Sequence, residues 1–464
     1  MTMLTVPILF PWVLAAVFAL LDGRKSWVGW LSVVGLAVSF ASVVALTFAV
    51  VQDGPVELVA GGWPEGVGIS LRADALGVTF AALSMGVVLV SLAYEVIIGV
   101  RSRTFPALIL FLATGLSGLF LTGDIFNFYV FFEISMTAAY ALTSYRERDH
   151  QIRAAFIFAI INLLGSVVFL ISVAALYHVT GSLDMQIVAE RIEEDVAPNS
   201  IITIAVAVFV AFSLKLGLFP FHFWLPAVYM GSHAPVAAIL SGALANIGSY
   251  GLLRFGAGIL PKELALGVIP IFILGTASII YGAVQAISRH ATVEVLAYSA
   301  IGQAGYILIA LAIGGTVGYG AAVIYAVVNS LNKALLFLAA GTRGPLVGAA
   351  FALGAFSVVG VPPVAGFLGK LALFKASLTV DSLPASIALV ALIFIGGALS
   401  FLYVFELYGR VFLKPNETDK KNSPLAARVL VLAVGVLVLA VGVWPEPLLV
   451  LANAAGDLLS NGGI

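Results

Sequence analysis

Apolar runs of about twenty residues recur from one end of this sequence to the other, and each is long enough to cross a lipid bilayer as a helix. In hydrocarbon the backbone polar groups of such a run must be satisfied within the protein, which favours helices. The chain is 62% hydrophobic and 10% charged, whereas soluble domains are about one quarter charged. The sequence therefore predicts an all-α polytopic membrane protein that forms a single transmembrane domain over residues 1–464.

We expect about 14 transmembrane helices, with ends uncertain by a few residues. The polar linkers between them are too short for a separate soluble domain. The first segment is preceded by no positive charge, so we expect it to be retained rather than cleaved as a signal peptide. The expected helices cover residues 5–21, 27–50, 74–99, 105–123, 125–144, 154–178, 201–219, 234–254, 265–287, 293–314, 317–341, 347–379, 386–409 and 427–444.

The distribution of basic residues predicts the orientation of the chain. If the first helix starts outside, 14 of the 22 Lys and Arg residues fall in cytoplasmic loops and 4 in outside loops, which agrees with the usual excess inside. We therefore expect a multi-pass protein of a prokaryotic plasma membrane with both termini outside. The cytoplasmic residues are Arg24, Lys25, Arg101, Arg103, Arg146, Arg148, Arg153, Arg289, Arg343, Arg410, Lys414, Lys420, Lys421 and Arg428, and the outside ones are Arg72, Arg191, Arg254 and Lys262.

Two apolar segments are interrupted by proline close to a lysine. The first, at residues 214–226, places Lys215 shortly before Pro220, and the second, at residues 361–370, ends in Lys370. Proline breaks a helix, and an ammonium near the bilayer centre costs about 2.5 to 3.5 kcal/mol. Interrupted backbone survives in lipid only where protein or water satisfies it. Two broken helices, each with a buried cation, predict an ion path.

Glu133 lies near the middle of an apolar, aromatic segment, where burial disfavours its charged form unless a cation lies close. We expect Lys215 to be that cation. Burial also disfavours a charged lysine, while a nearby carboxylate favours it, so separating or joining the two side chains would release or capture a proton. The alternative is a static ion pair that locks two helices together.

Lys333 lies about halfway along its apolar segment and is expected to relay protons between the lysines of the two broken helices. The alternative is a lysine bonded to backbone carbonyls or one whose amine reaches the membrane surface. Three charged residues nearer to helix ends are expected to reach the interface or to meet a partner subunit: Lys375, Glu95 and Glu406.

Histidines and polar residues near these lysines complete the candidate path. His233 opens a helix directly after the first break, and we expect it to pass protons because histidine titrates near neutral pH. His222, within the break, is a candidate relay. Ser299, Gln303 and Tyr306 share one helix face, where they would either hold water or join helices by hydrogen bonds. For both histidines the alternative is a structural group with satisfied hydrogen bonds.

Several function classes are excluded by what the sequence lacks. Without cysteine the chain has no disulfide, thiolate zinc site or cysteine-held iron–sulfur cluster. It has no Gly-x-x-x-x-Gly-Lys-Ser/Thr motif, which argues against an ATP-driven pump, and no basic stripe that would bind nucleic acid. We expect no cofactor and no metal.

Six stretches of the sequence carry a family resemblance. Together they resemble the antiporter-like subunits shared by Mrp-type cation/proton antiporters, respiratory complex I and membrane-bound hydrogenases, over about residues 70–410. The first stretch is most similar to the D-type subunit of Mrp antiporters. The stretches are GDIFNFYVFFE at 123–133, KLGLFPFHFWLP at 215–226, HAP at 233–235, LAYSAIGQ at 296–303, NKALLF at 332–337 and PPVAGFLGK at 362–370.

The resemblance implies a fold with two inverted five-helix repeats, approximately residues 105–255 and 265–410. It also implies a role for each buried charge. Glu133 and Lys215 would be the carboxylate and lysine of one half-channel, Lys333 the central relay, Lys370 the terminal lysine, and His233 would lie on the connecting axis. The resemblance implies one or two basic residues just before Leu-Ala-Tyr-Ser, as relatives usually have, whereas this chain departs from that pattern with Val293-Glu294-Val295.

We therefore expect the proton-translocating subunit of a multi-subunit Na⁺/H⁺ antiporter, a secondary transporter that works with related antiporter-like subunits in the lipid bilayer. The nearest alternative is a proton-pumping membrane subunit of an NADH-quinone oxidoreductase or membrane-bound hydrogenase, in which redox chemistry in other subunits supplies the energy. A third interpretation is a non-conducting scaffold subunit whose buried charges only hold helices together.

Overall fold

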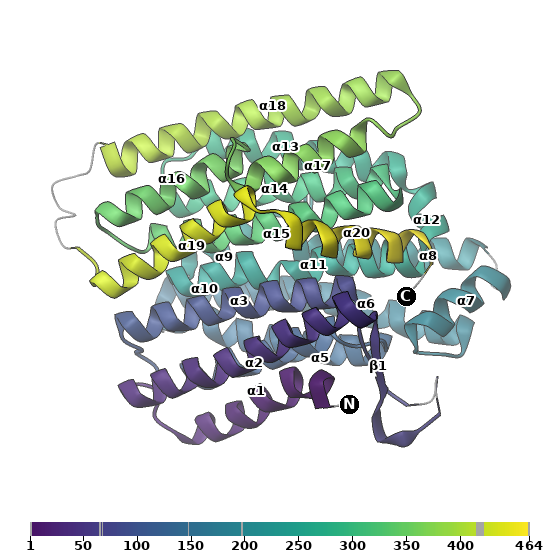
Figure 1. The fold of residues 1–464 in the computed structure, drawn as a ribbon, viewed down its shortest axis with the longest axis horizontal. Helices are drawn as coiled ribbons and strands as arrows, with labels where there is room; N and C mark the ends of the chain where they lie inside the picture. The colour runs from purple at the N-terminus through teal and green to yellow at the C-terminus, as the bar shows by residue number, and fades with distance from the viewer. Residues whose placement is uncertain are drawn as a thin grey trace.

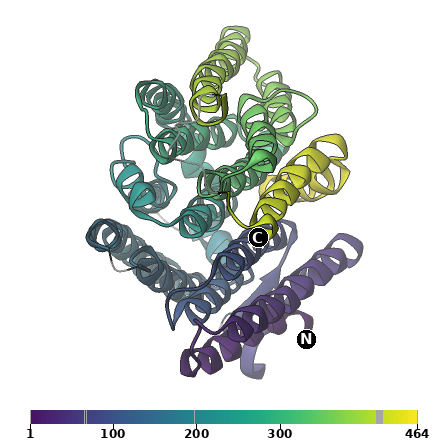
Figure 2. The same cartoon turned by 90° about the vertical axis from the view of Figure 1, so that its left-hand side faces the viewer.

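A computed structural model describes residues 2–64, 66, 68–146, 148–195, 198–413 and 422–462. Most of this part of the chain is helical, with one short β-hairpin. The long helices lie side by side in one bundle (Figure 1), and Figure 2 looks along them from one end.

The N-terminal part of the bundle contains long apolar helices and the hairpin, in which Val56 pairs with Ala73. Asp74 and Asp124 cap the helices that follow them, because their carboxylates accept the backbone N–H groups of Gly77 and Asn127. In order the elements are α1 (Thr2–Leu20), α2 (Ser26–Asp53), β1 (Val56–Val59), η1 (Ala60–Gly62), β2 (Ser70–Ala73), α3 (Ala75–Ile98), α4 (Phe105–Phe120), α5 (Ile125–Thr143), α6 (Asp149–Thr180) and α7 (Met185–Asp195).

The middle of the chain forms the first broken helix and the buried centre of the bundle. α8 (Pro198–Leu216) and α9 (Leu225–Gly231) flank the break. The next span, residues 234–259, is here named the central helix; it is almost wholly buried and packs against α3. It consists of α10 (Ala234–Ile239), η2 (Leu240–Leu244), α11 (Asn246–Gly251) and η3 (Leu252–Ile259), and both η segments are π-helical, a geometry frequent at functional sites.

The C-terminal part contains two further buried helices, α14 and α15, and the second broken helix, α16 and α17. The central helix packs against α15, which joins the two parts of the bundle. The elements are α12 (Pro261–Leu266), α13 (Val268–Ser288), α14 (Thr292–Ile313), α15 (Gly315–Ala340), α16 (Pro345–Val359), α17 (Ala365–Ser377), α18 (Leu383–Tyr408), η4 (Gly409–Leu413), α19 (Leu425–Val443) and α20 (Glu446–Ser460).

The transmembrane segments agree with the sequence prediction. Twelve described helical spans are long and apolar enough to cross a membrane, and two shorter apolar helices, α4 and α16, occupy two more of the predicted segments. Each of the fourteen predicted ranges therefore contains a helix. Both predicted breaks are confirmed, since α8 ends at Leu216 before α9 begins at Leu225, and α16 ends at Val359 before α17 begins at Ala365.

Other features differ from the sequence prediction. The hairpin, α7 and α20 were not expected. Arg254 was assigned to an outside loop, and this is wrong, because it lies in η3 of the central helix with only 3% of its surface exposed. Lys414, Lys420 and Lys421, which entered the orientation count, lie outside the described residues. The repeats at 105–255 and 265–410 stay a prediction.

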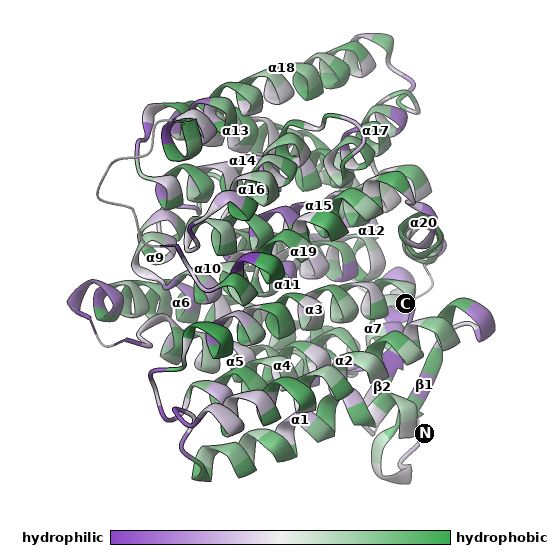
Figure 3. Ribbon diagram, turned by 60° about the vertical axis from the view of Figure 1, so that its left-hand side comes forward, coloured by the Kyte–Doolittle hydropathy of each residue, from purple (hydrophilic) through white to green (hydrophobic). Residues whose placement is uncertain are grey.

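The two ends of the bundle differ in their polar groups. The hairpin, α7, the start of α1 and the end of α20 lie at one end, here named the hairpin end (right in Figure 1). The loops that carry Arg101, Arg146 and Arg343 lie at the other, here named the arginine end. Between the ends, the outer helix faces are largely apolar (Figure 3), and large side chains such as Phe156 and Phe394 are exposed. Such a surface matches contact with lipid or with the helices of other subunits.

Candidate functional site

Lys215 lies in the last turn of α8, where the chain turns through Gly217 at a φ of 72° into the first break. Its ammonium group donates to the backbone oxygen of Asn162 at 3.0 Å and to the Ser166 hydroxyl at 3.3 Å, both on α6. The break itself is stabilised from within, because the Trp224 indole N–H donates to the Leu214 carbonyl at 3.0 Å. The interrupted backbone therefore gains a partner inside the protein, as burial in a membrane requires.

Glu133 does not form the expected direct pair with Lys215. In the described part of the chain no ion pair joins the two side chains, and Oε1 of Glu133 is buried without a hydrogen-bond partner. The two residues are nevertheless neighbours, since the Lys215 Nζ lies 4.2 Å from the ring centre of Phe132, which directly precedes Glu133 on α5. The lysine thus rests on neutral acceptors with a carboxylate close by.

Lys333 is completely buried in the C-terminal half of α15, further along the helix than predicted, and its Nζ donates to the Ser299 hydroxyl at 2.8 Å. That hydroxyl also bonds the Tyr403 hydroxyl at 2.9 Å. The Gln303 amide donates to Tyr403, at 3.4 Å, and accepts from Tyr325 at 2.5 Å. A chain of hydroxyl and amide groups from α14, α15 and α18 therefore extends from the buried ammonium.

Lys370 lies on α17 beside this chain of polar groups. Its Nζ donates to the backbone oxygen of Val359, the last residue of α16, and lies 5.8 Å from the ring centre of Tyr306. The Tyr306 ring in turn packs 5.0 Å from that of Tyr325, and its buried hydroxyl has no hydrogen-bond partner. Ser299, Gln303 and Tyr306, identified in the sequence as a polar face, thus lie between Lys333 and Lys370.

The two predicted histidines lie in different surroundings. His222 is buried in the first break, with its ring 4.5 Å from that of Tyr281, and its Nδ1 has no hydrogen-bond partner. His233 lies at the start of the central helix, and its Nδ1 is 3.3 Å from Oε2 of Glu95. The described contacts do not join His222 to the lysines.

Glu95 corrects the expectation of a solvated or subunit-facing carboxylate near a helix end. Its side chain is completely buried, accepts a hydrogen bond from the Tyr145 hydroxyl at 2.8 Å and lies 3.5 Å from the Arg146 guanidinium. In contrast, Glu406 is half exposed and pairs with Arg410, and Lys375 is exposed. Both therefore agree with an interfacial position.

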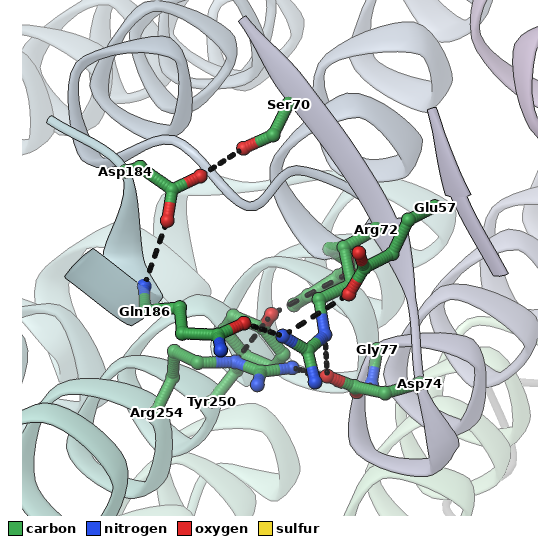
Figure 4. A network of polar contacts seen from close by, with 10 residues as sticks. Glu57, Ser70, Arg72, Asp74, Gly77, Asp184, Gln186, Tyr250 and Arg254 are labelled. Atoms are coloured by element: carbon green, nitrogen blue, oxygen red, sulfur yellow. Dashed lines mark hydrogen bonds and ion pairs between the residues drawn. The ribbon is translucent and has the colours of Figure 1, made fainter. Parts of the chain in front are cut away.

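A second buried network lies at the hairpin end (Figure 4). Arg254 donates to both carboxylate oxygens of Asp74 at 2.7 Å and to the Tyr250 hydroxyl at 3.0 Å. Arg72 lies 3.7 Å from Asp74 and 3.2 Å from Glu57. Glu57, Arg72 and Arg254 line a cavity of about 330 Å³. The sequence signal that we missed is Arg254 itself, a cation in an apolar run that could have been treated like Lys215.

Within the described ranges, no group of three or more His, Asp or Glu side chains is arranged to hold a metal ion. The chemistry that the site offers is proton exchange among lysine, carboxylate, imidazole, hydroxyl and amide groups.

Comparison with known proteins identifies the family. The model of the family described as "NADH:quinone oxidoreductase/Mrp antiporter, TM" matches residues 122–396, more than half of the chain. The chain belongs to this family. Another member, the D-type Na⁺/H⁺ antiporter subunit of Alkalihalophilus pseudofirmus, is 30% identical over 427 residues, which cover 87% of this chain and 86% of the relative.

Solved structures of this antiporter family agree with the fold. A chain of the Mrp complex from Dietzia sp. superposes with a TM-score of 0.89 at 25% identity and covers 99% of this chain and 98% of its own length. A chain of respiratory complex I from Thermus thermophilus gives 0.78 at 26% identity and covers 96% and 98%. The predicted resemblance and the all-α polytopic fold class are confirmed, whereas the roles of individual residues stay predictions.

Proposed function

We propose that this chain is the proton-translocating subunit of a multi-subunit Na⁺/H⁺ antiporter. It is a component of a secondary transporter and not an enzyme. The relative from A. pseudofirmus bears the name of such a subunit, and the neighbour from Dietzia sp. belongs to an Mrp complex, which supports assembly with other subunits. We place the arginine end in the cytoplasm of a prokaryotic cell, both termini outside, and related antiporter-like subunits among the partners.

The observation that carries this proposal is the environment of Lys333. A fully buried ammonium is costly, and the partner of this one is a hydroxyl at the head of a hydrogen-bonded chain. Hydroxyl groups both donate and accept, so a proton released by the lysine has a defined acceptor and a route towards Tyr403 and Gln303. A purely structural lysine would need no such chain.

Lys215 and Glu133 supply the second point of exchange. With its ammonium on the neutral acceptors of α6, Lys215 lacks the ion pair with Glu133 that would stabilise its charged form. Movement of Lys215 towards the unpartnered oxygen of Glu133 would favour protonation instead. The change from one contact to the other couples side-chain position to proton uptake, and Na⁺ movement elsewhere in the complex would drive it.

The alternative of a redox-driven proton pump is supported by the similarity to a chain of T. thermophilus complex I and by the family description, which also names NADH:quinone oxidoreductase. Because this chain has no cysteine to hold an iron–sulfur cluster, its partners would have to supply the electron carriers. The scaffold alternative, in which buried charges only hold helices together, has in its favour the buried ion pair of Arg254 and Asp74 but not one between Glu133 and Lys215.

The test is cation-driven proton movement in vesicles that carry the whole complex. We expect Lys215→Ala, Glu133→Ala and Lys333→Ala each to reduce exchange by about a hundredfold or more, the lower end of the range for loss of a proton-transfer group. Lys375→Ala removes an exposed lysine of α17 and serves as the matched control, with exchange as in the wild type. If the complex assembles and exchange persists in the first three variants, the buried charges are structural and the proposal fails.

A further inference from the structure

A pocket of about 240 Å³ lies at the arginine end, where three parts of the bundle meet. It is lined by the start of α6, the start of the central helix and the end of α15. These parts pack closely, because a Cβ atom at Gly231 would clash with Ala154 of α6. One at Gly341, directly after α15, would clash with Ala234 of the central helix. Since a water molecule takes up about 30 Å³ in the liquid, the pocket has room for a small anion.

Basic side chains line this pocket, and none of its described lining residues is acidic. The basic residues come from the loop before α6, from the first turn of α6 and from the start of the central helix, and they are Arg146, Arg148, His150 and His233. Arg148 and His150 are exposed, so the pocket reaches the surface. Neither forms an ion pair with any residue that the structure describes. The guanidinium group of Arg148 is therefore available to a ligand.

Gln151 adds a buried hydrogen-bond donor to the pocket. Only 3% of its surface is exposed, and its side-chain oxygen accepts the backbone N–H of Arg146 at 3.1 Å. That contact orients the amide, whose NH₂ group has no acceptor among the described residues and is not enclosed by them. The first N–H groups of α6 are free at the same end of the helix. A donor without an acceptor inside a protein is unfavourable, so this wall of the pocket favours a ligand that accepts hydrogen bonds.

Two carboxylates lie near the basic residues without lining the pocket. Glu95 is completely buried, 3.5 Å from Arg146 and 3.3 Å from His233. Asp149, in the first turn of α6, is exposed and is not among the lining residues. Glu95 therefore balances the charge of Arg146, while Arg148 pairs with neither carboxylate. The pocket thus keeps an excess of positive charge for a ligand.

We infer that this pocket binds a phosphate group. Phosphate oxygen atoms carry negative charge and accept several hydrogen bonds at once, and a guanidinium group donates to them through its planar fork. Arg148 and His150 bind the group from the rim, and the Gln151 amide binds it from within. Inorganic phosphate and the headgroup of an anionic phospholipid offer the same chemistry to these side chains.

The bound group would join helices that hold two of the buried lysines. α6 carries the acceptors of Lys215, which are the Asn162 carbonyl and the Ser166 hydroxyl. α15 carries Lys333, and its last turn lines the pocket. A phosphate group between the ends of α6 and α15 therefore stabilises the packing of these helices. The inference goes beyond the proposed function, because binding is measured without transport.

The test is thermal unfolding of the purified whole complex in phosphatidylcholine nanodiscs, because a ligand that binds the folded state raises the unfolding temperature. In one arm inorganic phosphate is added, with potassium chloride of equal ionic strength as the reference. In the other arm phosphatidylglycerol replaces part of the phosphatidylcholine. We expect the wild type to be stabilised in at least one arm. Arg148→Gln should need at least about tenfold more phosphate for half of the effect, or lose most of the effect of phosphatidylglycerol, because a charged hydrogen-bond donor is removed.

Arg153→Gln is the matched control, since it removes the same charge from an exposed position of α6 that does not line the pocket, and it should respond as the wild type does. His150→Gln is a second pocket variant and decides if Arg148→Gln does not assemble. Stabilisation by phosphate alone identifies a free anion as the ligand, and stabilisation by phosphatidylglycerol alone identifies a lipid headgroup. No stabilisation of the wild type, or equal stabilisation of the wild type and the pocket variants, overturns the inference.

Discussion

Replacing Lys333 by methionine distinguishes a functional lysine from a structural one. A buried ammonium near the bilayer centre costs about 3 kcal/mol on insertion scales, and a hydrogen bond from a charged donor recovers about 2 kcal/mol. Lys333 is fully buried and has one such bond, to Ser299. Because Ser299 keeps its bond to Tyr403 when the lysine is removed, no new unsatisfied group arises. We therefore expect Lys333→Met to stabilise the protein by about 1 kcal/mol.

The same substitution should abolish proton transfer, because methionine cannot bind a proton. The assay is therefore double: thermal unfolding of the purified complex in detergent, and cation-driven proton movement in vesicles. Lys375→Met is the control and should change neither quantity, since Lys375 is exposed. If Lys333→Met lowers the stability by about 1 kcal/mol or more, the lysine contributes to the fold, and the reasoning that it is retained for transport is refuted.

Three further predictions concern the networks around the path. Tyr403→Phe removes the hydroxyl that bonds Ser299 and Gln303 and should slow proton exchange at least about tenfold. Tyr408→Phe, near the end of the same helix, is the control and should leave exchange unchanged. Asp74→Ala leaves Arg254 buried without its partner and removes the cap of α3, so thermal unfolding should show a loss of stability of about 4 kcal/mol. Asp74→Asn keeps a capping side chain, so its loss of stability should be about 1 kcal/mol smaller. Equal losses in the two variants would contradict the capping role. Gly366→Ala places a methyl group against the Ser357 carbonyl and should lower both stability and exchange, whereas Gly409→Ala, with open space around it, should change neither.

The transmembrane helices were predictable because length and apolarity suffice to identify them. The breaks at 217–224 and 360–364 were predictable for a local reason, since proline removes a backbone donor wherever it stands. The face formed by Ser299, Gln303 and Tyr306 follows from helical spacing alone. Each of these predictions used residues within one helix, and the structure retains them all.

The contacts between helices were not predictable in the same way. Glu95 and His233 are 138 positions apart, and nothing near either residue in the sequence indicates that the two side chains meet. Arg254 was misassigned because the end of its apolar segment was placed at the arginine instead of beyond it. How helices pack against one another is not specified by periodicity within a single helix. Packing decides both that Glu95 and His233 lie 3.3 Å apart and that Glu133 and Lys215 form no ion pair.

Beside each broken helix a buried ammonium group rests on neutral oxygen atoms. The C-terminal end of a helix carries a partial negative charge and free carbonyl oxygens. Lys215 lies in the last turn of α8, and Lys370 reaches back from α17 to Val359 at the end of α16. The second break thus creates the helix end that holds Lys370, whereas Lys215 is held by oxygen atoms of α6. Because this stabilisation is weaker than that of a full ion pair, each lysine can release its proton, which an ion path requires and a static scaffold does not.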